Sequence, residues 1–145
     1  MRPTALWAYW TGTLRWALLG AQAGDTITFD PEIFPPGRPT TIFLTSEMPR
    51  ISQGDISIDA SNAGVILDGS KLPGNSVFGL VINSDHNTVM GVQIINFQGS
   101  GIYLEDGSYN RIGGDRSIGI GPLGQGNLIS NNFVGIGLLS LAEAT

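Results

Sequence analysis

The hydrophobic residues follow a helical period in one part of the chain, residues 13–22. The apolar positions there are Leu14, Ala17, Leu18 and Ala21. Their offsets of 0, 3, 4 and 7 place them on one face of an amphipathic helix. Gly24 follows the segment, as is typical after the last turn of a helix. The pattern therefore predicts one short helix near the N-terminus.

After Gly24 the pattern changes to short runs of β-branched and aliphatic residues. Each run is three to five residues long, and Gly, Asn, Asp, Ser or Pro separates it from the next. Such punctuation is typical of strands joined by turns. The runs occupy residues 26–29, 41–44, 55–58, 64–67, 79–82, 92–95, 101–104, 127–129 and 135–138. The connection between the first two runs carries four prolines and predicts a surface loop.

An internal repeat indicates how these strands are arranged. Residues 79–82 match residues 101–104, which follow 22 positions later, and these match residues 135–138, which follow 34 positions later. The neighbouring strands align as well, residues 87–91 with 110–114 and residues 94–97 with 128–131. The longer second interval predicts a glycine-rich loop insertion at about residues 113–126.

A repeat near 22 residues with three short strands predicts a parallel β-helix, an all-β solenoid whose coils stack about 4.8 Å apart. Inward-facing side chains would then lie over like side chains, which explains the recurring Ile and Leu. A two-sheet sandwich would also give short strands, but it would not require the same residue types at fixed offsets. Residues 25–145 leave room for about five coils.

Residues 1–24 are predicted to form an N-terminal cap, since the ends of a solenoid need cover. The cap would consist of an edge strand at Leu6–Trp10 and the amphipathic helix. The helix residues expected to pack across the first coil are Leu14, Trp16, Ala17 and Leu18. Trp7, Tyr9 and Trp10 could form a sugar-stacking platform, but burial beneath the cap is the favoured interpretation.

Composition narrows the class of protein. The chain has 145 residues and a mass of 15.3 kDa, which fits one domain, and its 41% hydrophobic and 13% charged residues argue against disorder. The lack of cysteine excludes disulfides and Cys-type zinc sites, and a single histidine excludes a multi-His metal site. A net charge of −5 with seven basic residues argues against a nucleic-acid partner. The apolar runs are too short to cross a bilayer, and no cofactor or membrane partner is expected.

Two parts of the chain carry a family resemblance. Residues 12–18 (GTLRWAL) and 23–31 (AGDTITFDP) resemble a leader in which a [ST]-L-R-x-A helix precedes A-G-D-T-I-x-F. Residues 110–114 (NRIGG) and 126–136 (GNLISNNFVGI) are similar to the repeat N-x-I-G-G … G-N-x-I-S-x-N … G-I. Both are features of bacterial right-handed parallel β-helix repeat proteins of the pectate-lyase-like superfamily. The resemblance spans about residues 12–138 and implies a right-handed solenoid without a particular activity.

The chain departs from that family in two respects. The family leader normally follows a strand and a signal peptide, whereas Met1–Trp10 lacks the apolar region and the small-x-small cleavage site of a signal peptide. The family proteins are also usually several hundred residues long. We therefore expect an excised or engineered N-terminal piece of a longer protein that is secreted or displayed at the cell surface.

The titratable residues show no complete catalytic pattern. Asp85 and His86 superficially resemble part of a polygalacturonase site, but the paired acids, the Gly-His-Gly and the Arg-x-Lys of such a site are missing. Both residues lie between two predicted strands, where corner positions are polar, so no catalytic residue is expected. Stacking could bring Asp85, Glu105 and Asp106 together as oxygen ligands for a hard cation. Solvated turn acids are the favoured interpretation, and no metal site is predicted.

The corner asparagines and the phenylalanines have predicted structural roles. In a solenoid, side-chain amides can bond to backbone groups of neighbouring coils. The asparagines at or near corners are Asn83, Asn87, Asn96, Asn110, Asn127, Asn131 and Asn132. Phe78, Phe97 and Phe133 are expected to belong to the core or to its stacks.

The sequence favours a structural role, that of a non-catalytic scaffold module. The exposed coil edge at the C-terminal end would be a template for strand pairing, so we expect the chain to associate with a second copy of itself. The residues predicted at that edge are Ile136, Leu138, Leu139 and Leu141. The alternative is a carbohydrate-binding or carbohydrate-active β-helix, such as a polysaccharide lyase or hydrolase. Its ligand-facing residues would be Tyr103, Glu105, Asp106 and Tyr109.

Overall fold

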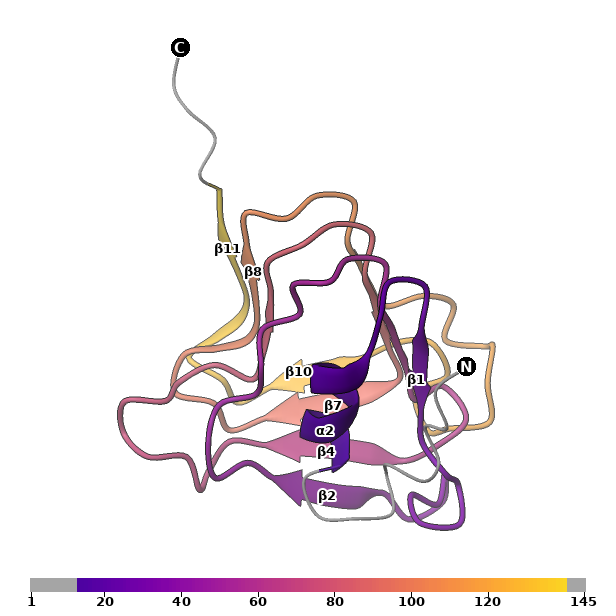
Figure 1. The fold of residues 1–145 in the computed structure, drawn as a ribbon. Coiled ribbons are helices and arrows are strands. Elements are labelled where there is room, and N and C mark those ends of the chain that lie inside the picture. The colour runs from indigo at the N-terminus through magenta and orange to yellow at the C-terminus, as the bar shows by residue number, and fades with distance from the viewer. Residues whose placement is uncertain (1–12, 141–145) are drawn as a thin grey trace.

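A computed structural model describes residues 13–140, and within them one short helix and eleven strands (Figure 1). The helix α2 covers Thr13–Gly20. The strands are β1 (Thr26–Thr28), β2 (Thr40–Phe43), β3 (Ser57–Asp59), β4 (Val65–Asp68), β5 (Leu80–Ile82), β6 (Thr88–Met90), β7 (Val92–Ile95), β8 (Ser100–Glu105), β9 (Arg111–Ile112), β10 (Leu128–Ser130) and β11 (Val134–Leu139). The described chain is therefore mostly β, as the sequence predicts.

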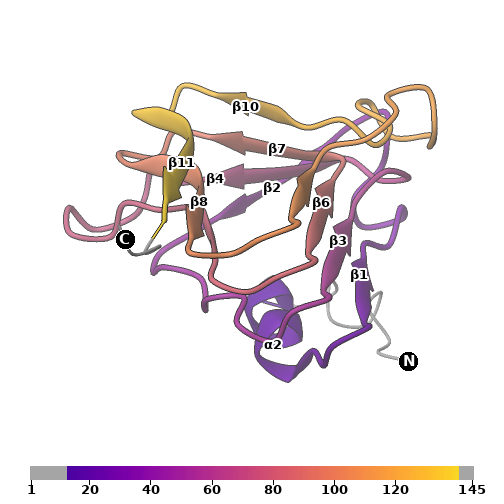
Figure 2. The same cartoon turned by 90° about the horizontal axis from the view of Figure 1, so that it is seen from above.

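The strands form three sheets in which every neighbouring pair is parallel. Sheet A has the order β1-β3-β6-β9, sheet B the order β2-β4-β7-β10, and sheet C the order β5-β8-β11. Seen from above, the three sheets form three sides around a common interior (Figure 2). Parallel strands need a crossover between them, and here the chain passes through the other two sheets before it returns to the same one.

The chain runs through sheets A, B and C in that order and then begins again, and one such pass is called a round below. The first round has no strand in sheet C, but Ile51 makes a single parallel bridge to Ile82. The described residues make four rounds, fewer than the five or so coils expected. In sheet A, equivalent residues lie 31 positions apart between the first three rounds and 23 apart between the last two. In sheet B the corresponding spacings are 25, 27 and 35. Because most rounds are longer than the expected 22 residues, fewer of them fit into the chain. The arrangement is compatible with a parallel β-solenoid.

Most of the internal repeat agrees with the observed strand register. Leu80 pairs with Ile102, and Ile102 pairs with Ile136, as the alignment of these segments predicts. The alignment of residues 94–97 with 128–131 is wrong by one position, because Ile94 pairs with Ile129. A shift by one residue turns every side chain to the other face of a strand. The observed register keeps both isoleucines on the inner face, where Ile94 is fully buried.

Columns of apolar residues at equivalent register positions fill the interior. The column of sheet A contains Ile27, Ile58, Val89 and Ile112. Those of sheets B and C contain Leu67, Ile94 and Ile129, and Ile51, Ile82 and Leu104, respectively. All of them belong to one core cluster or pack against it. Burying one such aliphatic side chain stabilises a fold by roughly 1.5–3 kcal/mol, so the columns hold successive rounds together.

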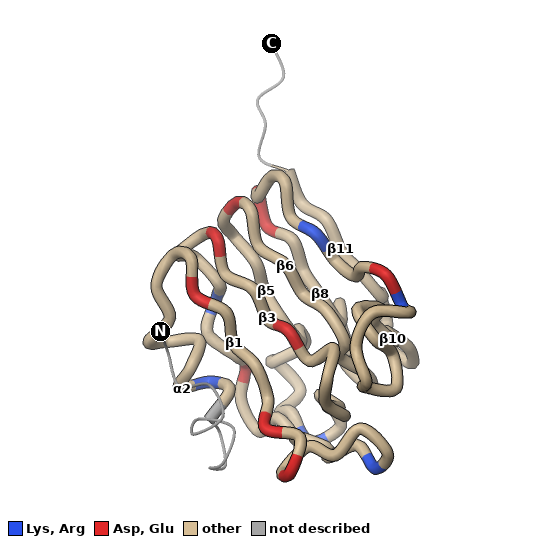
Figure 3. The backbone as a smooth tube through the Cα atoms, turned by 90° about the vertical axis from the view of Figure 1, so that its right-hand side faces the viewer, with Lys and Arg blue, Asp and Glu red and all other residues tan. Residues whose placement is uncertain are grey.

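Helix α2 lies beside β1 at the first-round end of the stack, whereas β10 and β11 lie at the opposite end (Figure 3). The apolar side chains on one face of α2, with Ala21 directly after it, are buried in the core cluster together with those of the first round. They are Leu14, Ala17, Leu18 and Ala21. The amide of Gln53 donates hydrogen bonds to the carbonyl oxygens of Leu18 and Ala21 at 2.7 and 3.1 Å. Both carbonyls belong to the end of the helix, where the backbone alone leaves acceptors unsatisfied.

The expectation that Trp16 packs across the first round is wrong. Its side chain is 54% exposed. At 3.6 residues per turn, Trp16 points about 200° around the helix from Leu14 and therefore away from the core. The predicted edge strand at Leu6–Trp10 and the predicted aromatic cluster there lie outside the described residues.

The corner that leads into sheet A has the same backbone conformation in every round. The residue two positions before each strand of this sheet has a positive φ: 94° at Gly24, 54° at Asp55, 63° at His86 and 58° at Tyr109. A left-handed conformation costs a residue other than glycine roughly 1–2 kcal/mol. In three rounds a residue other than glycine adopts this conformation despite its cost. The stacking of the rounds therefore restricts the backbone at this corner strongly.

Residues 113–127 connect β9 to β10 without a strand. The loop reaches back to the corner between β3 and β4, where the amides of Gly121 and Ile120 donate to Ser61 and Asn62 at 2.8 and 3.0 Å. In the intervening round a single residue, Gly91, separates β6 from β7. The loop therefore passes over the tight corner at Gly91 and forms hydrogen bonds with the corner between β3 and β4 in the round before it.

Candidate functional site

The corner that joins sheet C to sheet A carries an open depression of about 510 Å³. Its lining includes Gln53, Asp55, Asn83, Asp85, His86 and Asp106. These residues come from successive passes of the chain around the same corner, where acidic positions recur from one round to the next (Figure 3). Three of the titratable residues that the sequence analysis considered, Asp85, His86 and Asp106, therefore lie together at one edge of the stack.

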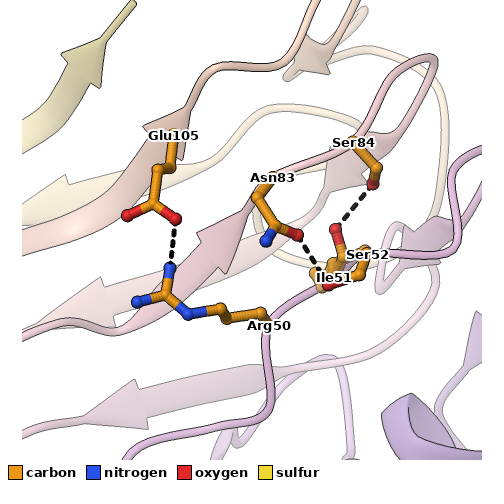
Figure 4. A network of polar contacts seen from close by, with 6 residues as sticks. All are labelled: Arg50, Ile51, Ser52, Asn83, Ser84 and Glu105. Atoms are coloured by element: carbon orange, nitrogen blue, oxygen red, sulfur yellow. Dashed lines mark hydrogen bonds and ion pairs between the residues drawn. The ribbon is translucent and has the colours of Figure 1, made fainter. Parts of the chain in front are cut away.

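Polar contacts beside this depression join different rounds (Figure 4). The Ser52 hydroxyl donates to Oδ1 of Asn83 at 2.7 Å, and the Ser84 hydroxyl donates to the carbonyl of Ile51 at 2.6 Å. Arg50 and Glu105 form an ion pair with an N–O distance of 2.6 Å. The pair is partly exposed, so it contributes at most about 1 kcal/mol to stability. All three contacts act between rounds rather than toward a ligand.

His86 and Asp85 are both held by the following round. The ring of His86 stacks on Tyr109 with centroids 5.1 Å apart and planes 13° from parallel. The His86 amide donates to the carbonyl of Ser108 at 3.1 Å, and the Ser108 amide donates to the Asp85 carboxylate at 2.8 Å. These contacts stabilise the corner itself, in line with the structural role that the sequence favours for both residues.

Of the three acids that stacking could bring together, the structure places Asp85 and Asp106 at the same depression and leaves Glu105 outside its lining. The Glu105 carboxylate binds Arg50, while the Asp85 carboxylate accepts from Ser108. Within residues 13–140, no group of three or more His, Asp or Glu side chains is placed to hold a metal ion. Asp106 lines the depression with Asp85 and His86, but Glu105 does not.

The four candidate ligand-facing residues do not all line the depression. Tyr103 lies in β8 and stacks on Phe78, with centroids 4.4 Å apart and planes 2° from parallel. Tyr109 stands at the corner before β9 and is largely exposed. Of the four, Asp106 alone is among the residues that line the depression.

Asparagine side chains accept hydrogen bonds from backbone amides at the corners. Oδ1 of Asn87 accepts from the amide of Ile56 at 3.0 Å, and Oδ1 of Asn110 accepts from the amide of Asn87 at 2.9 Å. Asn127 and Asn132 accept in the same way, each at 2.9 Å, from Val92 and Phe97. In the described part of the chain, no buried side-chain nitrogen or oxygen lacks a partner. The structural role predicted for these asparagines is confirmed by their hydrogen bonds.

Asp68 is a buried carboxyl at the end of β4. Its oxygens accept from the amide of Ser70 at 2.7 Å and from the side chain of Asn96 at 3.1 Å. Burial alone raises the pKa of this carboxyl. The hydrogen bonds from Ser70 and Asn96 and the charge of Lys71 outweigh burial and lower the pKa below the ordinary value of 3.8.

This lowered pKa predicts a loss of stability in acid. A carboxyl whose pKa is lower in the folded than in the unfolded protein stabilises the fold above its unfolded pKa. That stabilisation disappears as the pH falls through the folded pKa. We expect the free energy of unfolding, measured by urea denaturation, to fall below about pH 4, and to fall less steeply in Asp68→Asn. An identical pH dependence in the variant would contradict this role of Asp68.

The last round is open on its outer side. By register, Ile136 lies over the fully buried Ile102 and Leu138 lies over Leu104, yet Ile136 is 45% and Leu138 73% exposed. Within the described residues no further round covers them. Leu139 of the predicted edge is exposed as well, whereas Leu141 lies outside the described residues. The sequence repeat identifies this edge because the same spacing that buries Ile102 continues to Ile136.

Of the three phenylalanines expected in the core or its stacks, two lie there. Phe97 is buried, and Phe78 is half-buried under Tyr103. Phe133 is 84% exposed, so its assignment to the core or a stack is wrong. It lies between β10 and β11 in the last round, where no described residue packs above it. Its aromatic side chain therefore adds to the exposed apolar surface of this end.

Comparison of the chain with protein-family models, with curated proteins and with solved structures found no match. Among the residues that the structure describes, no helix is both long enough and apolar enough to span a membrane. The family resemblance of the leader and the repeat remains a prediction. The geometry of the described residues is the basis for the function proposed below.

Proposed function

We propose that this chain is a non-catalytic structural module, a right-handed parallel β-helix that forms the N-terminal, capped part of a longer secreted or cell-surface bacterial protein. The module stacks further β-structure on its open end. When the 145-residue chain is alone in solution, that structure is a second copy. One observation carries the proposal: the inward-facing columns reach the last round with Ile136 and Leu138 still exposed.

The open end has the properties of a surface that pairs with more strands. β11 is six residues long and pairs with β8 on one side, as the last strand of its sheet. Exposed strand edges offer a row of unpaired backbone groups to another chain. Covering Ile136 and Leu138 would also remove apolar surface from water, which favours association by about 25 cal/mol per Å².

The proposed right-handedness of the β-helix is supported by a general rule for crossovers and by the leader sequence. Crossovers between parallel strands of one sheet are right-handed in about 98% of cases, because a twisted strand packs back onto its sheet most easily in that sense. The chain enters each sheet repeatedly through such crossovers. The resemblance of residues 12–31 to the leader of bacterial right-handed β-helix proteins supports the same hand and an extracellular parent protein.

Sedimentation over a range of concentrations tests the structural proposal. We expect the mass to rise above 15.3 kDa with concentration, because the open end is progressively covered. Leu138→Lys places a charge in the exposed apolar surface and is expected to weaken association about tenfold or more, which corresponds to about 1.4 kcal/mol.

Leu19→Lys is the matched control for this experiment. Leu19 is 66% exposed, similar to Leu138, but it lies on α2 at the other end of the stack. The variant should associate like the original chain. A monomer at every concentration, or equal weakening by the two substitutions, would contradict association through the open end.

The second candidate function is carbohydrate binding, and one observation favours it. The exposed ring of Tyr109, stacked on His86, lies beside the polar depression, and exposed aromatic rings can stack on sugars. Binding on a glycan array that is lost in Tyr109→Ala would support this candidate. Turnover of a polysaccharide by the chain would overturn the non-catalytic proposal.

A further inference from the structure

The two ends of the stack differ in a way that restricts how two copies can meet. At the first-round end, α2 lies beside β1 and buries its apolar face, including Leu14 and Leu18, in the core cluster (Figure 3). At the other end, Ile136 and Leu138 of β11 remain exposed. Head-to-tail stacking needs both ends to accept a new round, and the helix occupies one of them.

The charged residues of the last round lie in β9 and just after it, at Arg111, Asp115 and Arg116, whereas β10 and β11 contain none. Residues 117–140 contain no Asp, Glu, Lys, Arg or His, although the whole chain has a net charge of −5. Natural proteins commonly protect sheet edges with charged residues, proline or bulges, and β11 contains neither a charged residue nor proline. The β11 edges of two identical copies can therefore approach one another without like-charge repulsion between the strands.

We propose that a second copy of this chain covers the open end, related to the first by a twofold axis. This inference rests on the proposed structural function and adds the identity and geometry of the partner. A twofold axis perpendicular to sheet C at the open end brings the two ends face to face, keeps the interiors of both copies on the same side of the joined sheet, and reverses the direction of β11. β11 therefore pairs antiparallel with β11 of the other copy, as antiparallel strands do at the edges of many parallel sheets.

The longest strand of the last round sets the position of the axis. β11 has six residues, whereas β10 has three and β9 has two, so β11 offers the longest edge. Full pairing of β11 with its copy places the axis next to Ile136 and Gly137, in the middle of the strand. The same residues then meet across the axis, as an interface with twofold symmetry requires.

This geometry predicts a closed dimer. An interface that uses the same surface of both copies leaves no second open end, since the outer ends of the dimer both carry α2. A head-to-tail interface would instead add copies without limit and produce filaments. The association should therefore stop at twice the mass of the chain.

Single-cysteine variants test the symmetry directly, because the chain has no cysteine of its own. Treatment of Ile136→Cys with a short bismaleimide should convert most of the protein to a covalent dimer, since the same residue of both copies lies near the axis. Leu138→Cys, which is more exposed, is a second variant in case Ile136→Cys loses its fold. Leu19→Cys on α2 is the matched control and should stay a monomer on a denaturing gel.

The alternatives give different results. Head-to-tail stacking would give a ladder of oligomers only when Leu19→Cys and Ile136→Cys are combined in one chain. That result would overturn the twofold dimer but would not contradict the proposed structural function. A cross-linked dimer of Leu19→Cys would place the interface at the helix and overturn the proposal. If no variant cross-links and the original chain sediments as a monomer, both the dimer and association through the open end are wrong.

Discussion

Replacing Phe97 by alanine is expected to lower the free energy of unfolding by about 3–5 kcal/mol. The side chain is 2% exposed at the corner that follows β7, and its ring fills space beside the backbone of the round beneath. A Cβ atom added to Gly69 would lie 2.3 Å from this ring, and one added to Gly79 would lie 3.1 Å from it. Alanine at position 97 leaves a cavity next to two glycines that have no side chains to fill it.

Chemical denaturation measures this loss, at a protein concentration where the chain is monomeric. Phe133→Ala is the matched control, because it removes the same side chain from an exposed position in the last round. It should cost less than about 0.5 kcal/mol. Equal losses in the two variants would show that the ring of Phe97 is not packed in the core.

A double-mutant cycle tests the contact between Phe97 and Gly69. Gly69→Ala alone should destabilise the protein, since the new methyl group would overlap the ring. In the Phe97→Ala background the same substitution should be nearly neutral or stabilising, because it fills part of the cavity. Additive effects would contradict direct contact, since residues in contact commonly couple by about 0.5 kcal/mol or more.

The sequence predicts the parts of this fold that follow from side-chain periodicity. Leu80, Ile102 and Ile136 recur at equivalent places, and the observed register pairs them in that order. Inward-facing positions of a strand repeat every second residue, so a column of aliphatic side chains strongly restricts the register. The apolar face of α2 is predictable for the same reason, since Leu14, Leu18 and their neighbours have the helical period.

Features that depend on loop length are not predictable in this way. The spacing between equivalent residues is 31 from Ile56 to Asn87 and 23 from Asn87 to Asn110, so one period could not give the number of rounds. The ion pair of Arg50 and Glu105 joins residues 55 positions apart and depends on how the rounds are placed over one another. The exposure of Phe133 depends on what lies above the last round, which hydrophobicity alone does not report.

Replacing Asn87 by alanine is expected to cost about 2–4 kcal/mol, because the buried amide of Ile56 loses its acceptor and two partly buried oxygens lose a donor. Asn87 is almost completely buried, and its Oδ1 accepts from the amide of Ile56. Its Nδ2 donates to the Ser84 hydroxyl and to Oδ1 of Asn110, at 3.0 and 2.9 Å. A methyl group can neither accept nor donate these bonds, and the corner is enclosed by the rounds on both sides.

Hydrogen exchange separates the local effect of this substitution from a general loss of stability. In Asn87→Ala the amide of Ile56 should exchange faster relative to Ile58, whose position in the middle of β3 does not depend on Asn87. Asn83→Ala is the matched control, because Asn83 accepts an exposed hydrogen bond from Ser52 and its loss should cost less than about 1 kcal/mol. If the two asparagine variants lose equal stability, water must replace the Asn87 amide, and the columns of apolar residues rather than the asparagines hold this corner.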